Sequence, residues 1–420
     1  MWALFVGVAM LMTGNGLQGA LLGVRAEREG FGLTVTGIIM TCYFIGFLFG
    51  AQGAVKAVAR VGHIRVFAGL ASLASTAVLV HALVVTPISW GVMRLVSGAC
   101  MAGLYVVIES WLNDMSTNAT RGRILSIYMV ASMGGYMIGS LLIDAADVDG
   151  FALFIVSSIM VSMSLVPVAL STTHVPPVRP PERSTVRQLA KIVPTGLMVS
   201  FLIGIVAGTL LGLGAVFAAN QGLSTSRIGA FLAAPIVGAV VWQFPVGWVS
   251  DHAPRRTVMV SLAVLGALMS GLLLTTDPAN NETLAYMFVL GGCVFPLYSL
   301  AIAYTNDWLP PESITPASAV LIRVNGGGAI LGPVLTALLM AQLDPMSFYW
   351  VMLGALSAIA AYVLYRIMVV GSIPVERQRQ YAPFPARGST VAAGLLPRRR
   401  RKSSPPPLPA STTDPTGQAG

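Results

Sequence analysis

Two stretches of the chain decide its architecture: residues 98–114 read GACMAGLYVVIESWLND, and residues 291–307 read GGCVFPLYSLAIAYTND. Both are apolar runs that begin with glycine, carry Leu-Tyr in the middle and end in Asn-Asp. The same offset of 193 residues, or one residue less, relates further pairs in order along the chain, namely Gly134-Gly135 with Gly327-Gly328, Gly139 with Gly332, Gly30 with Gly222, and Gly37 with Gly229. Matches at a nearly constant offset indicate an internal duplication.

The composition indicates a membrane protein, because 55% of the residues are hydrophobic and only 10% are charged, whereas a soluble domain carries about 25% charge. A bilayer-spanning helix needs about 20 apolar residues. Twelve windows meet this length, and they are apolar throughout rather than alternating, which favours helices over barrel strands. The windows are Trp2–Leu22, Thr34–Val55, Val66–Val84, Ile88–Leu112, Ile124–Leu142, Phe151–Leu170, Val193–Ala219, Ile228–Ser250, Thr257–Leu274, Leu284–Tyr304, Ala317–Met340 and Phe348–Val370.

The duplication divides these spans into two sets of six. Because six is even, both sets enter the membrane from the same side, as parallel repeats do. We expect an all-α membrane protein with twelve transmembrane helices in two parallel six-helix repeats. Its parts would be a first bundle (1–170), a polar linker rich in proline and arginine (171–192), a second bundle (193–370) and a disordered basic tail (371–420).

Lysine and arginine fall mainly in the loops on one side of this topology. The positive-inside rule therefore predicts that both termini, the linker and the tail are cytoplasmic, in a bacterial inner membrane. Six of the nine net positive charges belong to residues 371–420, so the basic balance does not indicate nucleic-acid binding. The run Arg398–Lys402 would either hold anionic lipid or only enforce the topology.

Cofactor and metal chemistry have no support in the sequence. The three cysteines lie inside apolar runs, and the four histidines are scattered without partners at ligand spacing. We find neither a nucleotide-binding loop nor a convergent set of acid, base and nucleophile. We therefore expect no cofactor, no metal and no enzyme activity.

The loop after the eighth span carries the clearest motif. Its residues Gly247-Trp-Val-Ser-Asp251-His-Ala-Pro-Arg255-Arg256 resemble the loop signature of the major facilitator superfamily. Arg94-Leu-Val-Ser-Gly98 resembles the superfamily's membrane-embedded arginine motif, and Gly328-Ala-Ile-Leu-Gly332-Pro333 resembles its antiporter motif. The stretches Gly103–Asn113, Phe295–Leu300 and Val61–Arg65 are similar to the YcaD-type branch. The resemblance covers residues 1–370, and it implies that the first, fourth, seventh and tenth spans line a central cavity.

Two charges lie on one predicted cavity helix. Arg94 would bind an anionic or hydrogen-bond-accepting group, or else only backbone carbonyls of the first span. Glu109 lies about 22 Å further along the helix and about 60° around it, so both residues can face one cavity without pairing. Because an apolar setting favours the protonated carboxyl, Glu109 would exchange a proton in a coupled carrier, or else form a gate pair with Arg60 or Arg123.

Further cavity candidates follow from the repeat. Residues present in only one copy suit an asymmetric substrate, and by this criterion Gln18 and the nearby Asn15 join Arg94 and Glu109. Tyr105 and Tyr298 are shared by both copies, so they also fit a common scaffold role.

Charges at the predicted cytoplasmic ends are candidates for a gate. Asp251 can cap a neighbouring helix, while Arg255 and Arg256 can reach Asp307 at the end of the tenth span. Contacts of this kind can form in one state of a transporter and break in the other. The first copy has Ala59 where the motif's aspartate stands, and the remaining gate candidates are Arg60, Asp114 and Arg323.

Closely spaced glycines predict where helices touch. The pairs Gly135/Gly139 and Gly328/Gly332 let backbones approach closely, either as static packing or as seams that move. Pro333 removes a backbone donor and can kink its helix.

These features together predict a secondary transporter that moves a small organic solute by alternating access, with protons as a candidate co-substrate. A facilitated-diffusion uniporter and a non-transporting membrane sensor are the alternatives. The expected partners are a small-molecule substrate and membrane lipid, with no nucleic acid, and the expected state is a monomer.

Overall fold

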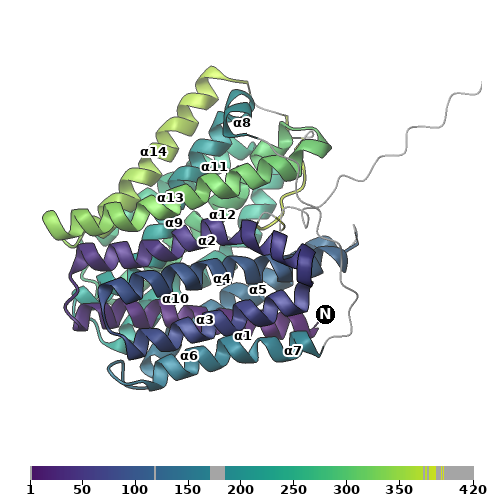
Figure 1. Cartoon of the computed structure of the whole chain (residues 1–420). Helices are drawn as coiled ribbons and strands as arrows, with labels where there is room; N and C mark the ends of the chain where they lie inside the picture. The colour runs from purple at the N-terminus through teal and green to yellow at the C-terminus, as the bar shows by residue number, and fades with distance from the viewer. Residues whose placement is uncertain are drawn as a thin grey trace, which may run out of the picture.

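A computed structural model describes residues 2–117, 120–170, 185–371, 374–375, 378–384, 389 and 391, and its regular structure is entirely helical (Figure 1). Twelve spans in this part of the chain are long and apolar enough to cross a membrane, so the predicted fold class is confirmed. The helices are α1 Trp2–Arg28, α2 Leu33–Val61, α3 His63–Leu83, α4 Pro87–Asp114, α5 Arg121–Leu141, η1 Leu142–Asp144, α6 Ala152–Met163, α7 Leu165–Ala169, α8 Val186–Ile192, α9 Pro194–Asn220, α10 Thr225–His252, α11 Arg255–Leu273, α12 Asn281–Asp307, η2 Pro311–Ser313, α13 Ile314–Gln342 and α14 Ser347–Val369.

The sixth span consists of two helices, α6 and α7, because its backbone ladder is interrupted at Ser164. Pro167 has no N–H with which to bond the carbonyl four residues earlier. Beside the break, the Ser164 hydroxyl donates to the carbonyl of Val161 at 2.6 Å. A local proline effect therefore explains the break within one membrane crossing.

The duplication seen in the sequence reappears in the packing. In the first half α1 packs on α5 and α6, and α2 packs on α4; in the second half α9 packs on α13 and α14, and α10 packs on α12. The two halves meet through α2 with α13, through α5 with α10, and through α1 with α9. The first two of these contacts exchange under the repeat, as a twofold axis between the halves requires.

Glycines permit close helix contacts at equivalent places in both halves. A Cβ atom at Gly139 of α5 would lie 2.1 Å from the carbonyl oxygen of Thr13 in α1. A Cβ atom at Gly328 of α13 would lie 2.1 Å from the carbonyl oxygen of Phe201 in α9. Gly135 and Gly332 make similar approaches to the same partner helices. The predicted glycine pairs thus join α1 to α5 and α9 to α13.

The halves touch at one end of the bundle and separate at the other. Because each half has six spans, α1 begins and α14 ends at the same end, toward the right of Figure 1, which we call the terminal end. At the opposite end, which we call the far end, Thr225 donates to Asp144 at 2.5 Å and Asn220 donates to Glu27 at 3.1 Å. These contacts join the halves, whose helices spread apart toward the terminal end (Figure 1).

The glycine contact makes a first prediction. Gly139→Ala should lower the thermal unfolding midpoint of the purified protein by several degrees, because overpacking a well-packed contact costs about 1–3 kcal/mol. Gly134→Ala is the matched control in the same helix, since no atom lies within 4 Å of a Cβ placed there. Equal midpoints for the two variants would show that the α1–α5 contact is looser than described.

Candidate functional site

Arg94 is buried in α4 beneath an aromatic ring. Its Cζ atom lies 4.5 Å from the centre of the Tyr43 ring in α2, a cation–π arrangement. One turn further along α4, Ser97 faces Gln18 of α1 across 3.4 Å. Asn15 is also buried in α1. Three of the predicted cavity residues therefore lie on α1 and α4, where they offer a guanidinium and two amides.

Glu109 is fully buried near the terminal end of α4, and it accepts hydrogen bonds from two segments. The hydroxyl of Tyr128 in α5 donates to Oε1 at 2.9 Å. The backbone N–H of Ser389 donates to Oε2 at 2.9 Å, and the Ser389 hydroxyl donates to the same oxygen. The buried carboxylate of Glu109 in the first half is thus bonded to the C-terminal region of the chain.

The two tyrosines shared by the repeat are both buried but have different neighbours. Tyr105 donates its hydroxyl to the sulfur of Met12 in α1 at 2.9 Å. Tyr298 packs edge-on against Phe384, with ring centres 6.0 Å apart. The symmetry of the sequence therefore does not extend to the contacts of these side chains.

A charged cluster closes the terminal end of the second half. Arg255 at the start of α11 donates from Nε to Asp307 at 2.7 Å and from a terminal nitrogen to Ser250 at 3.0 Å. Asp251 lies 3.8 Å from the same guanidinium. The structure thus brings together three predicted gate residues, but all of them belong to α10, α11 and α12. This cluster by itself does not join the two halves.

Arg256 lies next to Arg255 in sequence, but its guanidinium binds groups of α12 and of the end of α14. Its guanidinium donates to the hydroxyl of Tyr304 at 2.8 Å and to the carbonyl of Val370 at 2.6 Å. It also lies over the rings of Tyr304 and Trp308. The contacts fix the end of the last helix, which is a structural role within the second half.

Part of the C-terminal tail is ordered against the bundle. We call residues 378–384 together with Ser389 the strap. Ala382, Phe384 and Ser389 are buried, whereas composition alone predicts a disordered tail. The run Arg398–Lys402 lies outside the described residues, and the linker is described only from residue 185, where a capping box between Thr185 and Gln188 starts α8.

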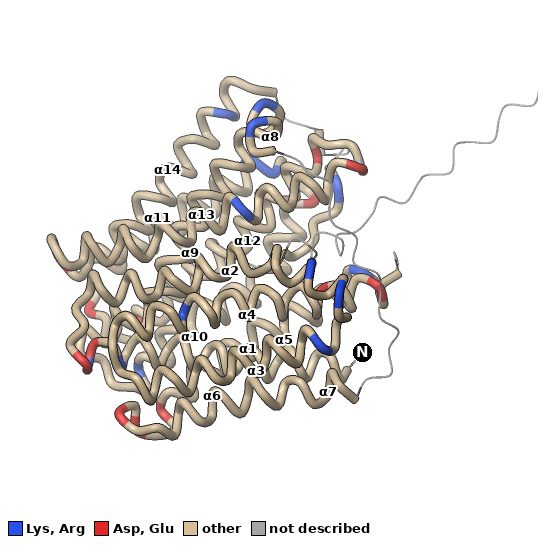
Figure 2. Tube along the Cα trace, in the orientation of Figure 1, with Lys and Arg blue, Asp and Glu red and all other residues tan. Residues whose placement is uncertain are grey.

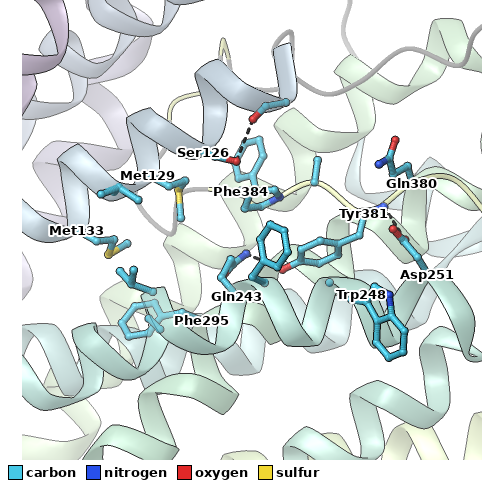
Figure 3. Close-up of a pocket in the computed structure, with 18 residues that line it drawn as sticks. Ser126, Met129, Met133, Gln243, Trp248, Asp251, Phe295, Gln380, Tyr381 and Phe384 are labelled. Atoms are coloured by element: carbon cyan, nitrogen blue, oxygen red, sulfur yellow. Dashed lines mark hydrogen bonds between the residues drawn. The ribbon is translucent and has the colours of Figure 1, made fainter. Parts of the chain in front are cut away.

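The strap is held by side chains of the second half. Its backbone N–H groups at Arg379, Tyr381 and Phe384 donate to oxygens of α10 and α12, at 2.8, 2.7 and 2.9 Å, and the respective acceptors are Asp307, Asp251 and Ser299. Figure 3 shows the Tyr381 ring directed toward Gln243, whose amide donates to the Tyr381 hydroxyl at 2.6 Å. Burial raises the pKa of Tyr381 far above its usual value, so this phenol stays neutral at physiological pH.

A cavity of about 540 Å³ lies beside the strap, between α5 and α10. This volume is in the range of small-molecule sites. Met129 and Met133 line it from α5, Phe295 lines it from α12, and Tyr381 and Phe384 form part of its wall (Figure 3). Of the residues predicted from the sequence, only Asp251 lines it.

The remaining predicted gate residues are not part of these clusters. Arg60 and Asp114 are exposed and form no ion pair within the described part of the chain. Arg323 is exposed and donates to the carbonyl of Ala319 in its own helix at 3.3 Å. The described residues also contain no group of three or more side chains that could hold a metal ion.

Sequence reasoning missed the partners of Glu109 and of the charged cluster formed by Asp251, Arg255 and Asp307. Tyr128, Gln243 and Ser299 gave no signal, because single polar residues in apolar helices are common. Tyr381 and Phe384 gave a weak one: they are aromatic residues in a tail otherwise rich in proline, small and basic residues. An aromatic pair of this kind is typical of a segment that packs against something.

The fold and the charged cluster of Asp251, Arg255 and Asp307 are both typical of one protein family. The sequence profile of the Major Facilitator Superfamily matches residues 4–234 and 196–408. The chain belongs to the major facilitator superfamily. As a member, it is a multi-pass membrane transporter rather than an enzyme.

Curated relatives support a particular branch. The chain is 28% identical over 370 residues to an uncharacterized MFS-type transporter of Enterobacter sp. (strain 638), covering 86% of this chain and 94% of that one. It is 26% identical over 366 residues to the uncharacterized MFS-type transporter YcaD of Escherichia fergusonii, with the same coverage. The predicted resemblance to the YcaD-type branch is therefore confirmed.

Solved structures of other superfamily members share the fold. The nucleoside transporter NupG superposes with a TM-score of 0.70 at 13% identity, covering 88% of this chain and 99% of that one. A bacterial homolog of the human lysosomal transporter Spinster, in an inward-facing and occupied conformation, gives a TM-score of 0.67 at 14% identity, with 89% and 97% covered.

The loop cluster makes a second prediction. Asp307→Asn should lower the thermal unfolding midpoint strongly, because removing one partner of a buried pair costs about 3–5 kcal/mol. Both side chains of the Arg255–Asp307 pair are at most 2% exposed.

Asp149→Asn is the control. Its pair with Arg28 has a similar contact distance of 2.6 Å, but the side chains are 52% and 43% exposed, so its loss should cost about 1 kcal/mol or less. If both variants unfolded at the same temperature, the buried pair would not hold the ends of α11 and α12 together.

Proposed function

We propose that this chain is a secondary transporter that moves a small organic solute by alternating access. The observation that carries the proposal is the asymmetric contact between the halves. They are joined at the far end by Thr225–Asp144 and Asn220–Glu27 and spread apart at the terminal end (Figure 1). Rocking about an interface that closes at one end at a time is how parallel-repeat carriers expose a site to each side in turn.

We infer that the terminal end faces the cytoplasm of a bacterial inner membrane. Lysine and arginine gather mainly at that end, whereas the far end carries many of the acidic residues (Figure 2). This distribution supports the orientation through the positive-inside rule. The open end in this arrangement would be the inner one.

The proposed solute site lies between the halves, where α1 and α4 present polar groups on one side. Arg94, Gln18 and Asn15 are buried there and have no equivalents in the second repeat. A buried guanidinium over an aromatic ring suits a solute with one anionic or hydrogen-bond-accepting group. Neighbouring apolar and aromatic surface suits the remainder of an amphipathic molecule.

Glu109 is the proposed proton site. It is an acidic side chain fully buried within a span, and buried ionisable groups in spans mark ion and proton pathways. Tyr128 contacts one of its oxygens, so the carboxyl group has a neutral partner in either protonation state. A monomer suffices for this mechanism, because the proposed solute site and the proposed proton site lie within one chain.

A flux assay tests the transport proposal. The purified protein in liposomes should show saturable uptake of at least one compound from a panel of uncharged and singly anionic amphipathic solutes, and protein-free liposomes should show none. Arg94→Ala should raise the half-saturating concentration of an anionic substrate about tenfold or more, since a charge-assisted bond is worth about 1.5–3 kcal/mol. Saturable binding in a thermal-shift assay without any flux would favour the membrane-sensor alternative.

The proton role makes a separate prediction. Glu109→Gln should abolish stimulation of uptake by a pH gradient while leaving exchange of solute across the membrane intact, because exchange needs no net proton movement. Tyr128→Phe is the control, since it removes one donor to Glu109 but keeps the carboxyl group. Gradient-driven uptake that persists in Glu109→Gln would indicate facilitated diffusion or another proton site.

A further inference from the structure

The strap lies between the two halves of the transporter at their open end. It is bonded to the second half through Asp251, Ser299 and Asp307. Through Ser389 it is bonded to Glu109 of the first half, 280 residues away in sequence. The described residues of the strap therefore contact both halves at the terminal end.

The match between strap and bundle extends along the backbone. Four of its N–H groups, at Arg379, Tyr381, Phe384 and Ser389, donate to oxygens of buried or partly buried side chains. Pro383 has no N–H to satisfy. Three of the acceptors are carboxylates, and buried acceptors of this kind are costly to leave unpaired. The bundle thus presents side-chain acceptors to four backbone donors of the strap.

Two aromatic side chains of the strap also pack closely against the second half. Phe384 is 2% exposed and packs on the Tyr298 ring. The Tyr381 ring occupies the space left open by Gly247, where an added Cβ would lie 2.6 Å from its Cδ1 atom. Gly247 belongs to the loop signature that the sequence revealed. A side chain at this position would therefore displace the strap.

We propose that the strap is an autoinhibitory segment that occupies the terminal-end opening and blocks the entry of aqueous solutes into the central cavity. Glu109, the proposed proton site, and Tyr298, a cavity candidate from the sequence, are in contact with it. A solute entering from this end must displace these contacts. The inhibitory role of the strap rests on the proposed transport function. The position of the strap in the terminal-end opening does not depend on that function.

Tethering explains how a short segment can hold this position. A segment joined to its binding surface through a short connection has a local concentration of the order of mM. Even a weak intrinsic affinity then keeps the opening filled in most molecules. The apparent affinity for any competing solute is reduced by the fraction of molecules in which the opening is free.

The test measures access to a buried position behind the strap. Ser299→Cys, in a chain whose three native cysteines are replaced by alanine, places a thiol where the strap bonds. Its reaction rate with a charged, water-soluble thiol reagent is compared between the full chain, a chain that ends at Gly371 and a chain that ends at Gly394. The last of these chains keeps the strap and lacks the basic run, so it separates the two parts of the tail.

We expect the chain that ends at Gly371 to react about tenfold faster than the other two, as when the strap fills the opening in about nine of ten molecules. Lys56→Cys, an exposed position at the terminal end of α2, should react equally fast in all three chains. A synthetic peptide of residues 374–394 at mM concentration should restore protection. The same peptide with Tyr381→Ala and Phe384→Ala should not.

Two further results keep the outcome decisive. If the shortened chain is unstable, the full chain with Tyr381→Ala and Phe384→Ala should show the faster reaction. Equal rates at Ser299→Cys with and without an intact strap would overturn the proposal. Protection by the strap together with no solute flux, even in the chain that ends at Gly371, would instead overturn the transport function and leave the strap's occupancy established.

Discussion

The absence of water in the hydrocarbon core of a bilayer is the constraint on which this structure depends. Every backbone N–H and C=O in the spans must be bonded within its own helix, so helices are the units that pack. Lipid is as apolar as leucine, so helices associate through close backbone approach rather than through the hydrophobic effect. Gly139 and Gly332 provide that approach at equivalent points of the two halves, and the remaining packing scheme repeats around them.

The same constraint explains what the sequence could predict. Span length, span number and the duplication follow from apolar runs and glycine spacing, and the structure has them. The Asp251, Arg255 and Asp307 cluster was also foreseeable, because a motif and a helix end place those residues at one level of the bundle. The stacking of Arg94 on Tyr43 was not, because it depends on the rotational setting of α2 against α4.

The strap shows where composition misleads. A tail rich in proline, small and basic residues is typical of disorder, since it cannot bury enough apolar surface by itself. Here the buried surface is supplied by the bundle, because Phe384 packs on Tyr298 and the Tyr381 ring lies against Gly247. The bonds to Ser389 join positions 280 residues apart, which no local pattern reports. A prediction from composition considers the segment without the bundle as its partner.

The two halves differ at their terminal ends. The second half keeps the aspartate and arginine of the loop signature, and its cluster is bonded to the strap. The first half has Ala59 in place of the aspartate, and Arg60 is exposed. Within the described residues, the second half therefore holds the strap through Asp251, Ser299 and Asp307, and the first half holds it through Glu109.

The backbone donors of the strap suggest a template for the design of small ligands. Three carboxylates and a serine hydroxyl on the bundle accept N–H groups from one stretch of chain, with aromatic rings seated between them. This pattern is a pharmacophore that the protein's own sequence supplies. Under the proposed autoinhibition, short peptidomimetics that copy the Tyr-Ala-Pro-Phe core of residues 381–384, with prolines that limit their flexibility, are a rational starting point for inhibitors of this carrier.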